Sequence, residues 1–242
     1  MRKIALLLAP HPDDESITGL LALRLQEECG FKIWVVPATL GSRVERQAAR
    51  REELKSACAV LGFQLRFLKS WVGPADRLKE LCGVLEALAP SVVFIPHAKD
   101  GHATHRATHQ LGVAAIDAAR QPFFHVVETE YWHPMEHPNL MVATDEKQMV
   151  KLCRALACHQ GEVARNDYAA RLPAWMSDNV RRGAELIGSA GGAAPNIAFA
   201  TLYRARKRTG GKWHMEFRGG RLAESSADLE ALVALWNPPR GR

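Results

Sequence analysis

The sequence predicts an α/β fold, with a Rossmann-like, mostly parallel sheet flanked by helices and a mixed C-terminal part. Short apolar runs alternate with longer amphipathic runs across residues 3–120, which is the pattern of βαβ units. The apolar runs are almost continuously hydrophobic, as expected for strands that are covered on both faces. Beyond residue 120 this alternation loosens, so we expect a mixed arrangement there.

The first 120 residues are expected to hold strands at 3–9, 32–39, 64–68 and 91–96. Helices are expected at 16–30, 46–62, 75–90 and 105–120, because apolar residues recur there at helical spacing. Gly30 and Gly62 are positioned to end two of these helices, and Pro90 to stop a third.

The C-terminal part is expected to contain strands at 123–132, 139–144 and 197–207. A helix at 145–160 would begin after Asp145 as its N-cap, and a last helix at 226–236 would be capped by Ser226. Residues 211–217 are expected to form a hairpin with 197–207 across a glycine turn. We expect a single domain over residues 1–242, in which residues 1–120 form the α/β core that holds the metal site and residues 121–242 complete it.

The composition excludes few classes of protein, but it limits the number of domains and the kinds of partner. The chain has 242 residues, of which 47% are hydrophobic, and this suits one domain with a sizeable core. The net charge is +6, without a block of like charges, so no nucleic-acid partner is expected. An anionic small molecule would suit the same charge.

The cysteines and the first residues indicate a cytoplasmic protein. No C-x-x-C pair occurs among the five cysteines, and four of them lie in apolar helical runs, so we expect reduced, buried thiols. The apolar run after Met1 is too short to cross a membrane and has no credible cleavage site. We therefore expect neither a signal peptide nor a transmembrane segment.

Two polar clusters follow two of the expected strands. His11, Asp13 and Asp14 come directly after the strand at 3–9, and His102 and His105 follow the strand at 91–96. Ligands of open α/β sheets bind outside the carboxyl ends of the strands, so the two clusters are expected to form one site. Burying such charges without a partner costs several kcal/mol, which points to a bound cation.

The residue types narrow the choice of cation. Imidazole and carboxylate together suit Zn²⁺ or another divalent transition metal better than Mg²⁺ or Ca²⁺. Two histidines and one carboxylate leave coordination positions open, which is typical of catalytic sites. Spacing alone does not decide which of Asp13 and Asp14 binds the metal and which faces its water.

Several other side chains have more than one interpretation. His105 and His109 are four residues apart, so they could form a different metal pair on one helix face. Glu15 is either a supporting residue of the site or part of the first helical turn. His159 ends a helix, where a cation is favoured in any case, and we expect it to be structural. His133 is a candidate substrate contact, with a position on the rim as the alternative.

These motifs resemble a known family. The segment "PHPDDE" after an apolar strand, then "TLGS", an Arg/Glu-rich helix ending in "LG" and an H-x-x-H pair are similar to the PIG-L/LmbE family of zinc-dependent N-acetylglucosaminide deacetylases. The resemblance spans roughly residues 3–206. The helix ending in "HQ" near residue 160 adds support.

The resemblance implies a role for each residue of the two clusters. It places the metal on His11, Asp14 and His105. Asp13 becomes the general base that takes a proton from the metal-bound water, and His102 stabilises the oxyanion. The resemblance also implies an arginine that reaches the substrate, for which Arg50 and Arg51 are the candidates. The family commonly has H-P-D-H, whereas this chain has Thr104 in place of the aspartate, and an alternative role for Thr104 is to cap the following helix.

We therefore expect a zinc-dependent hydrolase that removes acetyl from an N-acetylated amino sugar or sugar conjugate and releases acetate. One alternative is an amidase acting on a larger acyl or thiol-sugar conjugate. Another is a non-catalytic α/β module that binds a sugar or nucleotide, although no G-x-G-x-x-G follows the first strand. A homo-oligomer is possible.

Overall fold

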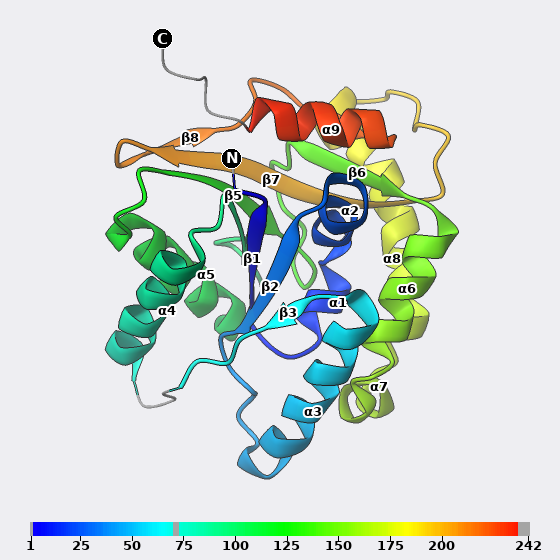
Figure 1. Ribbon diagram of the computed structural model, residues 1–242. Coiled ribbons are helices and arrows are strands. Elements are labelled where there is room, and N and C mark those ends of the chain that lie inside the picture. Colours follow the sequence, from blue (N-terminus) through cyan, green and yellow to red (C-terminus); the bar gives the residue numbers. More distant parts are fainter. Residues whose placement is uncertain (1, 70–72, 237–242) are drawn as a thin grey trace.

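Strand β1 (Ile4–Ala9) lies inside the sheet, third from one edge, in the computed structural model of the chain, which describes residues 2–69 and 73–236. It pairs in parallel with β2 (Lys32–Pro37) on one side and with β4 (Val92–Pro96) on the other. Nine strands of the described ranges form one sheet in the order β3-β2-β1-β4-β5-β7-β6-β9, with β8 paired to β7 (Figure 1). The predicted mixed α/β fold with a mostly parallel sheet is confirmed.

The remaining strands extend the sheet at both ends. They are β3 (Gln64–Leu65), β5 (Phe123–Thr129), β6 (Leu140–Thr144), β7 (Phe199–Thr209), β8 (Lys212–Met215) and β9 (Arg221–Ala223). The helices of the described residues are α1 (Asp14–Ile17), α2 (Leu20–Cys29), α3 (Val44–Leu61), α4 (Pro74–Leu88), α5 (Ala103–Ala118), α6 (Glu146–Leu156), α7 (Gln160–Arg165), α8 (Tyr168–Gly183) and α9 (Ser226–Leu235), and a π-helical turn (Ala184–Gly188) follows α8.

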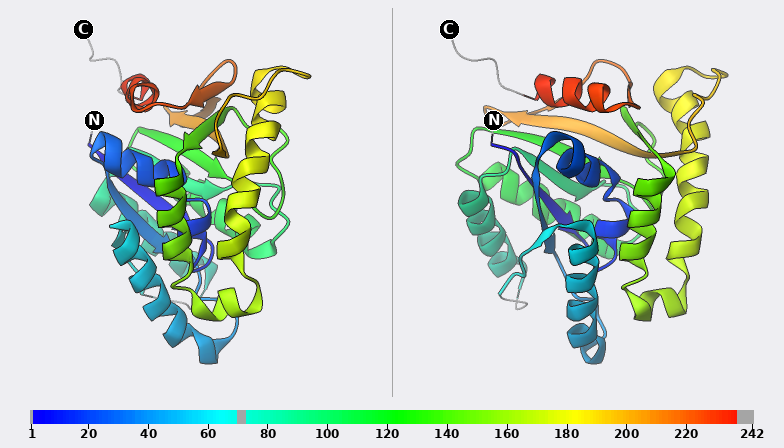
Figure 2. Two further views of the ribbon diagram at one scale, coloured as in Figure 1. Left: turned by 90° about the vertical axis from the view of Figure 1, so that its right-hand side faces the viewer. Right: turned by 45° about the vertical axis from the view of Figure 1, so that its right-hand side comes forward.

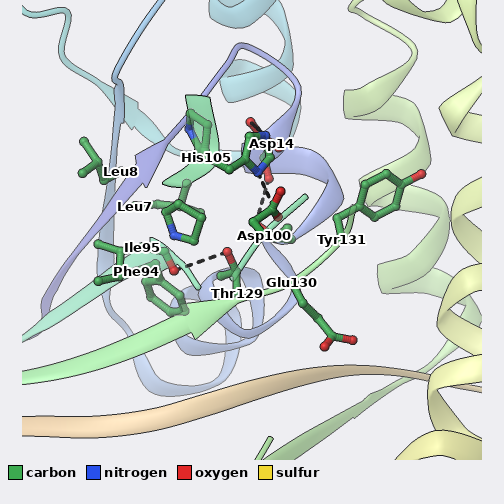
Figure 3. A pocket seen from close by; sticks show the side chains of 13 residues that line it. Leu7, Leu8, Asp14, Phe94, Ile95, Asp100, His105, Thr129, Glu130 and Tyr131 are labelled. Atoms are coloured by element: carbon green, nitrogen blue, oxygen red, sulfur yellow. Dashed lines mark hydrogen bonds and ion pairs between the residues drawn. The ribbon is translucent and has the colours of Figure 1, made fainter. Parts of the chain in front are cut away.

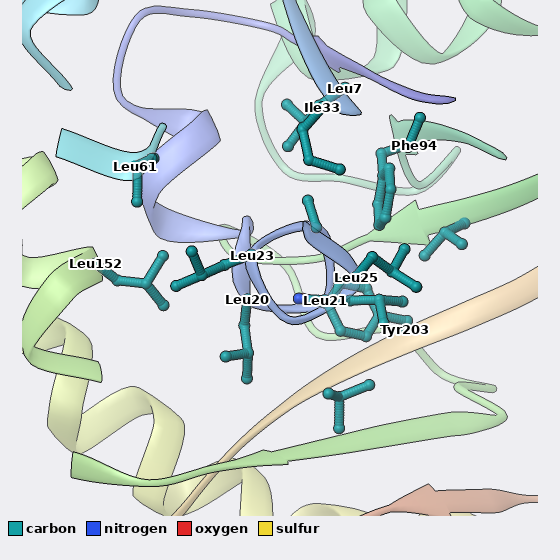
Figure 4. Packing of buried hydrophobic residues seen from close by; sticks show 14 of the residues in the cluster. Leu7, Leu20, Leu21, Leu23, Leu25, Ile33, Leu61, Phe94, Leu152 and Tyr203 are labelled. Carbon is teal, nitrogen blue, oxygen red and sulfur yellow. The ribbon is translucent and has the colours of Figure 1, made fainter. Parts of the chain in front are cut away.

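Helices cover both faces of the sheet, and β1 supplies side chains to both cores. Leu6 and Leu8 pack into the core beneath α4 and α5. Leu7 points to the opposite face, into the core formed with α2, α3, α6, α8 and α9 (Figures 2 and 4). Burying each such leucine stabilises the fold by about 1.5–3 kcal/mol, which explains the continuous apolar run.

The order of the strands reverses between β1 and β4. From β1 the chain continues to β2 and β3 on one side, then crosses to β4 and β5 on the other. β1 and β4 are parallel neighbours, so their carboxyl ends lie at the same edge of the sheet. Such a reversal opens a crevice where ligands bind in α/β proteins, and both polar clusters lie at this edge.

The C-terminal part differs in places from the sequence prediction. Residues 161–188, for which no element was predicted, contain α8 and most of α7. The cap of the last helix was wrong by one residue, because Ser225 and not Ser226 accepts from the backbone N–H of Asp228 in a capping box. The hairpin is confirmed, with Gly210 and Gly211 at positive φ between β7 and β8.

Tyr203 of β7 links the C-terminal part to the segment that follows β1. Its buried hydroxyl accepts a hydrogen bond from the backbone N–H of Leu21 at 3.0 Å and donates one to the carbonyl of Thr18 at 2.9 Å. This link supports the single domain, which stays a prediction. Within the described ranges, no helix has the length and apolar character needed to cross a membrane.

We predict that Tyr203→Phe lowers the free energy of unfolding by about 1–3 kcal/mol, because it leaves two buried backbone groups without a partner. Urea unfolding followed by circular dichroism measures this change. Tyr131→Phe is the control, since the Tyr131 hydroxyl makes no hydrogen bond within the described residues. Equal midpoints for Tyr203→Phe and the unsubstituted protein would show that the link is unimportant.

Candidate metal centre

The first cluster is held in a tight turn between β1 and α1. The backbone N–H of His11 donates to Oδ2 of Asp14 at 2.8 Å. Asp13 caps α1 with φ of 126°, a backbone conformation that strongly favours glycine. An aspartate held there costs of order 1–3 kcal/mol, so surrounding contacts must maintain it. The turn thus fixes the directions of two neighbouring carboxylates.

The second cluster lies at the start of α5, beyond the end of β4. His102 is the N-cap of this helix, and its ring Nδ1 accepts from the backbone N–H of Thr104 at 3.2 Å. The expectation that Thr104 caps the helix is therefore wrong. His105 lies in the first turn of α5 and is buried, whereas His102 is exposed.

The side chains of the two clusters converge as the sequence predicted. The candidate ligand nitrogens of His11, His102 and His105 lie within 4.8 Å of one another. Oδ2 of Asp14 lies 3.5 Å from Nδ1 of His11 and 3.5 Å from Nε2 of His105. Two sets of side chains are therefore close enough to bind an ion. One is His11, His105 and Asp14, and the other is His11, His105 and His102.

The geometry of His11, Asp14 and His105 fits a divalent transition metal. A tetrahedral ion with bonds of about 2.0–2.1 Å separates its ligand atoms by roughly 3.3–3.4 Å, close to the two spacings at Asp14. Nε2 of His105 is buried and has no hydrogen-bond partner. A buried ring nitrogen without a partner, facing a carboxylate, fits a ligand of a metal ion.

Asp100 supports both histidines of the second cluster, and the sequence analysis missed it. Its Oδ2 lies 3.2 Å from Nδ1 of His105, and its Oδ1 accepts from the backbone N–H of His102 at 2.7 Å. The carboxylate thereby fixes the His105 ring with Nε2 toward Asp14. The one signal for Asp100 in the sequence was its position closely before the two candidate histidines.

Figure 3 shows the back of the site, where Asp14, Asp100 and His105 meet above the ends of β4 and β5. A hollow of about 10 Å³ lies there, which is roughly the size of one water molecule. Glu130 also lines this hollow and forms an ion pair with Arg182 of α8 at 2.5 Å. The ion pair thus links one wall of this hollow to α8 of the C-terminal part.

The electrostatics separate the two aspartates. Burial alone would raise the pKa of Asp14, but His105 and His11 outweigh it and lower the pKa to about 2. Burial and the neighbouring Asp14 charge raise the pKa of Asp13 well above its usual value, despite the opposing charge of Arg50. Asp14 is therefore the better anionic ligand, and Asp13 is the more basic carboxylate.

His102 is better suited to donate a hydrogen bond than to bind a metal. Its Nδ1 accepts from a backbone N–H, so the neutral ring carries its proton on Nε2. Burial and the neighbouring His11 and His105 lower the pKa of His102, which favours this neutral form. The tautomer is set by the backbone of Thr104, so it does not depend on the aspartate of the family motif.

A cavity of about 750 Å³ opens in front of the two clusters. Arg50 lines it and donates to the carbonyl of Pro12 at 3.0 Å. Arg51 does not lie with it, because its guanidinium stacks on the ring of Phe67 at 3.9 Å. Trp132 lines the cavity, whereas the predicted substrate contact His133 is not among its lining residues.

The other histidines of the sequence analysis have different surroundings. Nδ1 of His109 lies 2.8 Å from the carbonyl oxygen of Pro96, so one ring nitrogen of the rival pair is already engaged. The carbonyl of His133 lies 2.9 Å from Nε2 of His97, which follows the end of β4. His159 is buried against Glu15.

Fold and site together define an α/β protein with a candidate metal centre at the switch point of its sheet. Residues 6–116 match the family model PIG-L, described as GlcNAc-PI de-N-acetylase, and this stretch is a PIG-L family domain. The family resemblance seen in the sequence is thus confirmed for this part of the chain. The comparison with curated proteins found no match.

Solved structures show the same fold over most of the chain. One is the 4-carboxy-2-hydroxymuconate hydratase GalB from Pseudomonas putida KT2440, with a TM-score of 0.65, 22% identity and coverage of 84% of this chain and 95% of that one. Another is N,N′-diacetylchitobiose deacetylase from Pyrococcus horikoshii, with a TM-score of 0.64, 18% identity and coverage of 86% of this chain and 84% of that one. A third is the zinc-inhibited form of teicoplanin deacetylase Orf2, with a TM-score of 0.62, 14% identity and coverage of 84% of this chain and 97% of that one.

We predict that His11→Ala and His105→Ala each sharply lower the zinc bound per chain, because each removes one of the three candidate protein ligands. Elemental analysis of the purified variants measures this.

Two control variants are expected to retain zinc. His109→Ala should do so because its ring is engaged elsewhere, and His102→Ala because Nε2 carries a proton. Loss of zinc in His102→Ala with retention in Asp14→Asn would favour the three-histidine set. Loss of zinc in His109→Ala, with retention of zinc in His105→Ala, would contradict this ligand set and favour a metal site on the helix face that carries His109.

Proposed function

We propose that the protein is a metal-dependent N-deacetylase that removes acetyl from an N-acetylated amino sugar or sugar conjugate and releases acetate. The observation that carries this proposal is the convergence of His11, Asp14 and His105 beside the carboxyl group of Asp13, which lines the cavity. The PIG-L domain at 6–116 and the two deacetylases of the same fold support it.

In this proposal His11, Asp14 and His105 hold a divalent metal ion, with Zn²⁺ as our first choice. The orphaned Nε2 of His105 and the carboxylate beside it fit such an ion. When bound, the ion supplies a Lewis acid that makes water more acidic and polarises a carbonyl group.

The protein's own side chains carry the proton and charge movements. Asp13 accepts the proton of the attacking water, and its raised pKa makes it a stronger base than an ordinary aspartate. Nε2–H of His102 donates to the oxygen on which negative charge develops. Arg50 holds the turn through Pro12 and lies 3.9 Å from the Asp13 carboxylate, so it acts on the base as well as on the cavity.

A hydratase is the second candidate function. The hydratase GalB shares the fold, and its substrate is named as a carboxylate. The cavity of this chain favours anions, because its lining includes Arg43, Arg46, Arg50, Arg77 and Arg165 against the carboxylates of Asp13, Asp14 and Glu162. Such a lining also suits a sugar conjugate that carries an anionic group.

A substrate panel tests the proposal. The zinc-loaded protein would be incubated with N-acetyl amino sugars, their anionic conjugates, larger N-acyl analogues and unsaturated hydroxy-dicarboxylates. We expect acetate release from one of the N-acetyl compounds. Release of only larger acyl groups would indicate the amidase, and loss of the double bond without acetate would indicate the hydratase. The cytoplasmic location and the possible homo-oligomer stay predictions.

We predict opposite behaviour for the two aspartate variants. Asp14→Asn should weaken zinc binding, because an amide is a poorer ligand than a carboxylate. Asp13→Asn should keep zinc but lose roughly 100-fold or more of its activity, as expected when a general base is removed. Zinc content and acetate release, followed across a zinc titration, measure both effects.

Added zinc should restore part of the activity of Asp14→Asn and none of that of Asp13→Asn. If Asp13→Asn instead loses zinc while Asp14→Asn retains it, the two roles are reversed.

A further inference from the structure

Glu15 and His159 form a buried pair beside the candidate metal centre. Oε1 of Glu15 lies 2.8 Å from Nε2 of His159, and both side chains are fully inaccessible to solvent. Glu15 belongs to α1, and His159 lies between α6 and α7, where it is the N-cap residue of α7. A carboxylate that is removed from water in this way needs a hydrogen-bonding or cationic partner, and His159 provides one.

The same carboxylate also holds the backbone of Asp13. Oε2 of Glu15 accepts from the Asp13 N–H at 2.9 Å, and Oε1 accepts from the Ser16 hydroxyl at 2.7 Å. Asp13 is one of two residues other than glycine with positive φ in the described ranges, at 126°. The hydrogen bond from Glu15 therefore acts on the strained residue itself.

We propose that His159 is a positioning residue for Asp13: it fixes Glu15, and Glu15 holds the Asp13 backbone in the conformation that presents its carboxylate to the cavity. The part that concerns catalysis rests on the proposed function. The part that concerns the Asp13 backbone does not.

If the pair of Glu15 and His159 only stabilised the fold, a different result would be expected. Removing one partner of a buried pair destabilises a protein wherever the pair lies. The chain offers a matched control, because Nδ1 of His125 lies 2.9 Å from Oε2 of Glu216, and both of these side chains are buried. His125 is near the start of β5, whereas the candidate site is beyond the carboxyl ends of the strands.

If the loss of His159 acted by displacing α7, the expected result would again be different. Glu162 and Arg165 of α7 line the cavity, so moving this helix would change substrate binding and raise KM. Loss of the Asp13 position should instead lower kcat, with KM little changed.

The experiment compares His159→Ala, His159→Gln and His125→Ala in the full-length chain. Amide hydrogen exchange at Asp13, followed by NMR, reports the backbone hydrogen bond without any substrate. Zinc content, kcat and KM report the site, and urea unfolding reports stability.

We expect exchange at Asp13 to rise about 10-fold in His159→Ala, as for the loss of one hydrogen bond to a charged group. We also expect kcat to fall about 10- to 100-fold, with KM within about twofold and zinc retained. His159→Gln should recover most of both changes, because its amide N–H can donate to Glu15. His125→Ala should lose stability and change neither quantity.

The proposal is overturned if folded His159→Ala keeps the exchange rate and kcat of the unsubstituted protein. It is also overturned if His125→Ala changes both to the same extent, or if KM alone changes. If the unsubstituted protein cleaves no compound of the panel, the proposed function fails. The exchange rates then still decide whether His159 positions the Asp13 backbone.

Discussion

Three consecutive carboxylates, Asp13, Asp14 and Glu15, are buried in the turn after β1, with exposed fractions of 8%, 3% and 0%. Like charges this close repel each other strongly away from water, so the fold has to provide each with a partner. Asp14 lies between His11 and His105, and Glu15 is bonded to His159. Asp13 has the weakest compensation, with Arg50 at 3.9 Å, which is consistent with its raised pKa.

These partners come from distant parts of the chain. Arg50 is on α3, His105 is on α5, and His159 precedes α7. One turn therefore depends on helices from both faces of the sheet and from both halves of the sequence. The second half of the chain contributes to this site although the PIG-L match ends at residue 116. Tyr203 adds a link from β7 to the same segment.

The fold and the meeting of the two clusters could be predicted because both follow from short-range patterns. The alternation of strands and helices defines a parallel sheet, and the position of each cluster after a strand defines the edge. The apolar spacing of Tyr168, Leu172, Met176 and Val180 contained a signal for α8. Pro173 lies in the same segment, and a proline usually ends a helix, but α8 continues through it.

What could not be predicted depends on contacts between distant residues. Arg50 and Arg51 are adjacent on one helix, and nothing local decides that the first faces the cavity and the second faces Phe67. The burial of Asp100 becomes visible only when α5 places His105 against it. The same holds for Glu15, for which the sequence left two interpretations open, because its partner His159 is 144 residues away.

The protonation states of Asp13 and His102 indicate which of the two gives a proton to the amine in the last step of the proposed reaction. The departing amine has to gain a proton, and Asp13 and His102 are the groups in position to supply it. No carboxylate side chain is bonded to the ring of His102 in the described residues, and its lowered pKa favours the neutral ring. Neutral His102 can donate a hydrogen bond but is a poor acid. In the proposed reaction Asp13 accepts a proton from water, and its raised pKa favours holding that proton, so we expect Asp13 to return it to the amine.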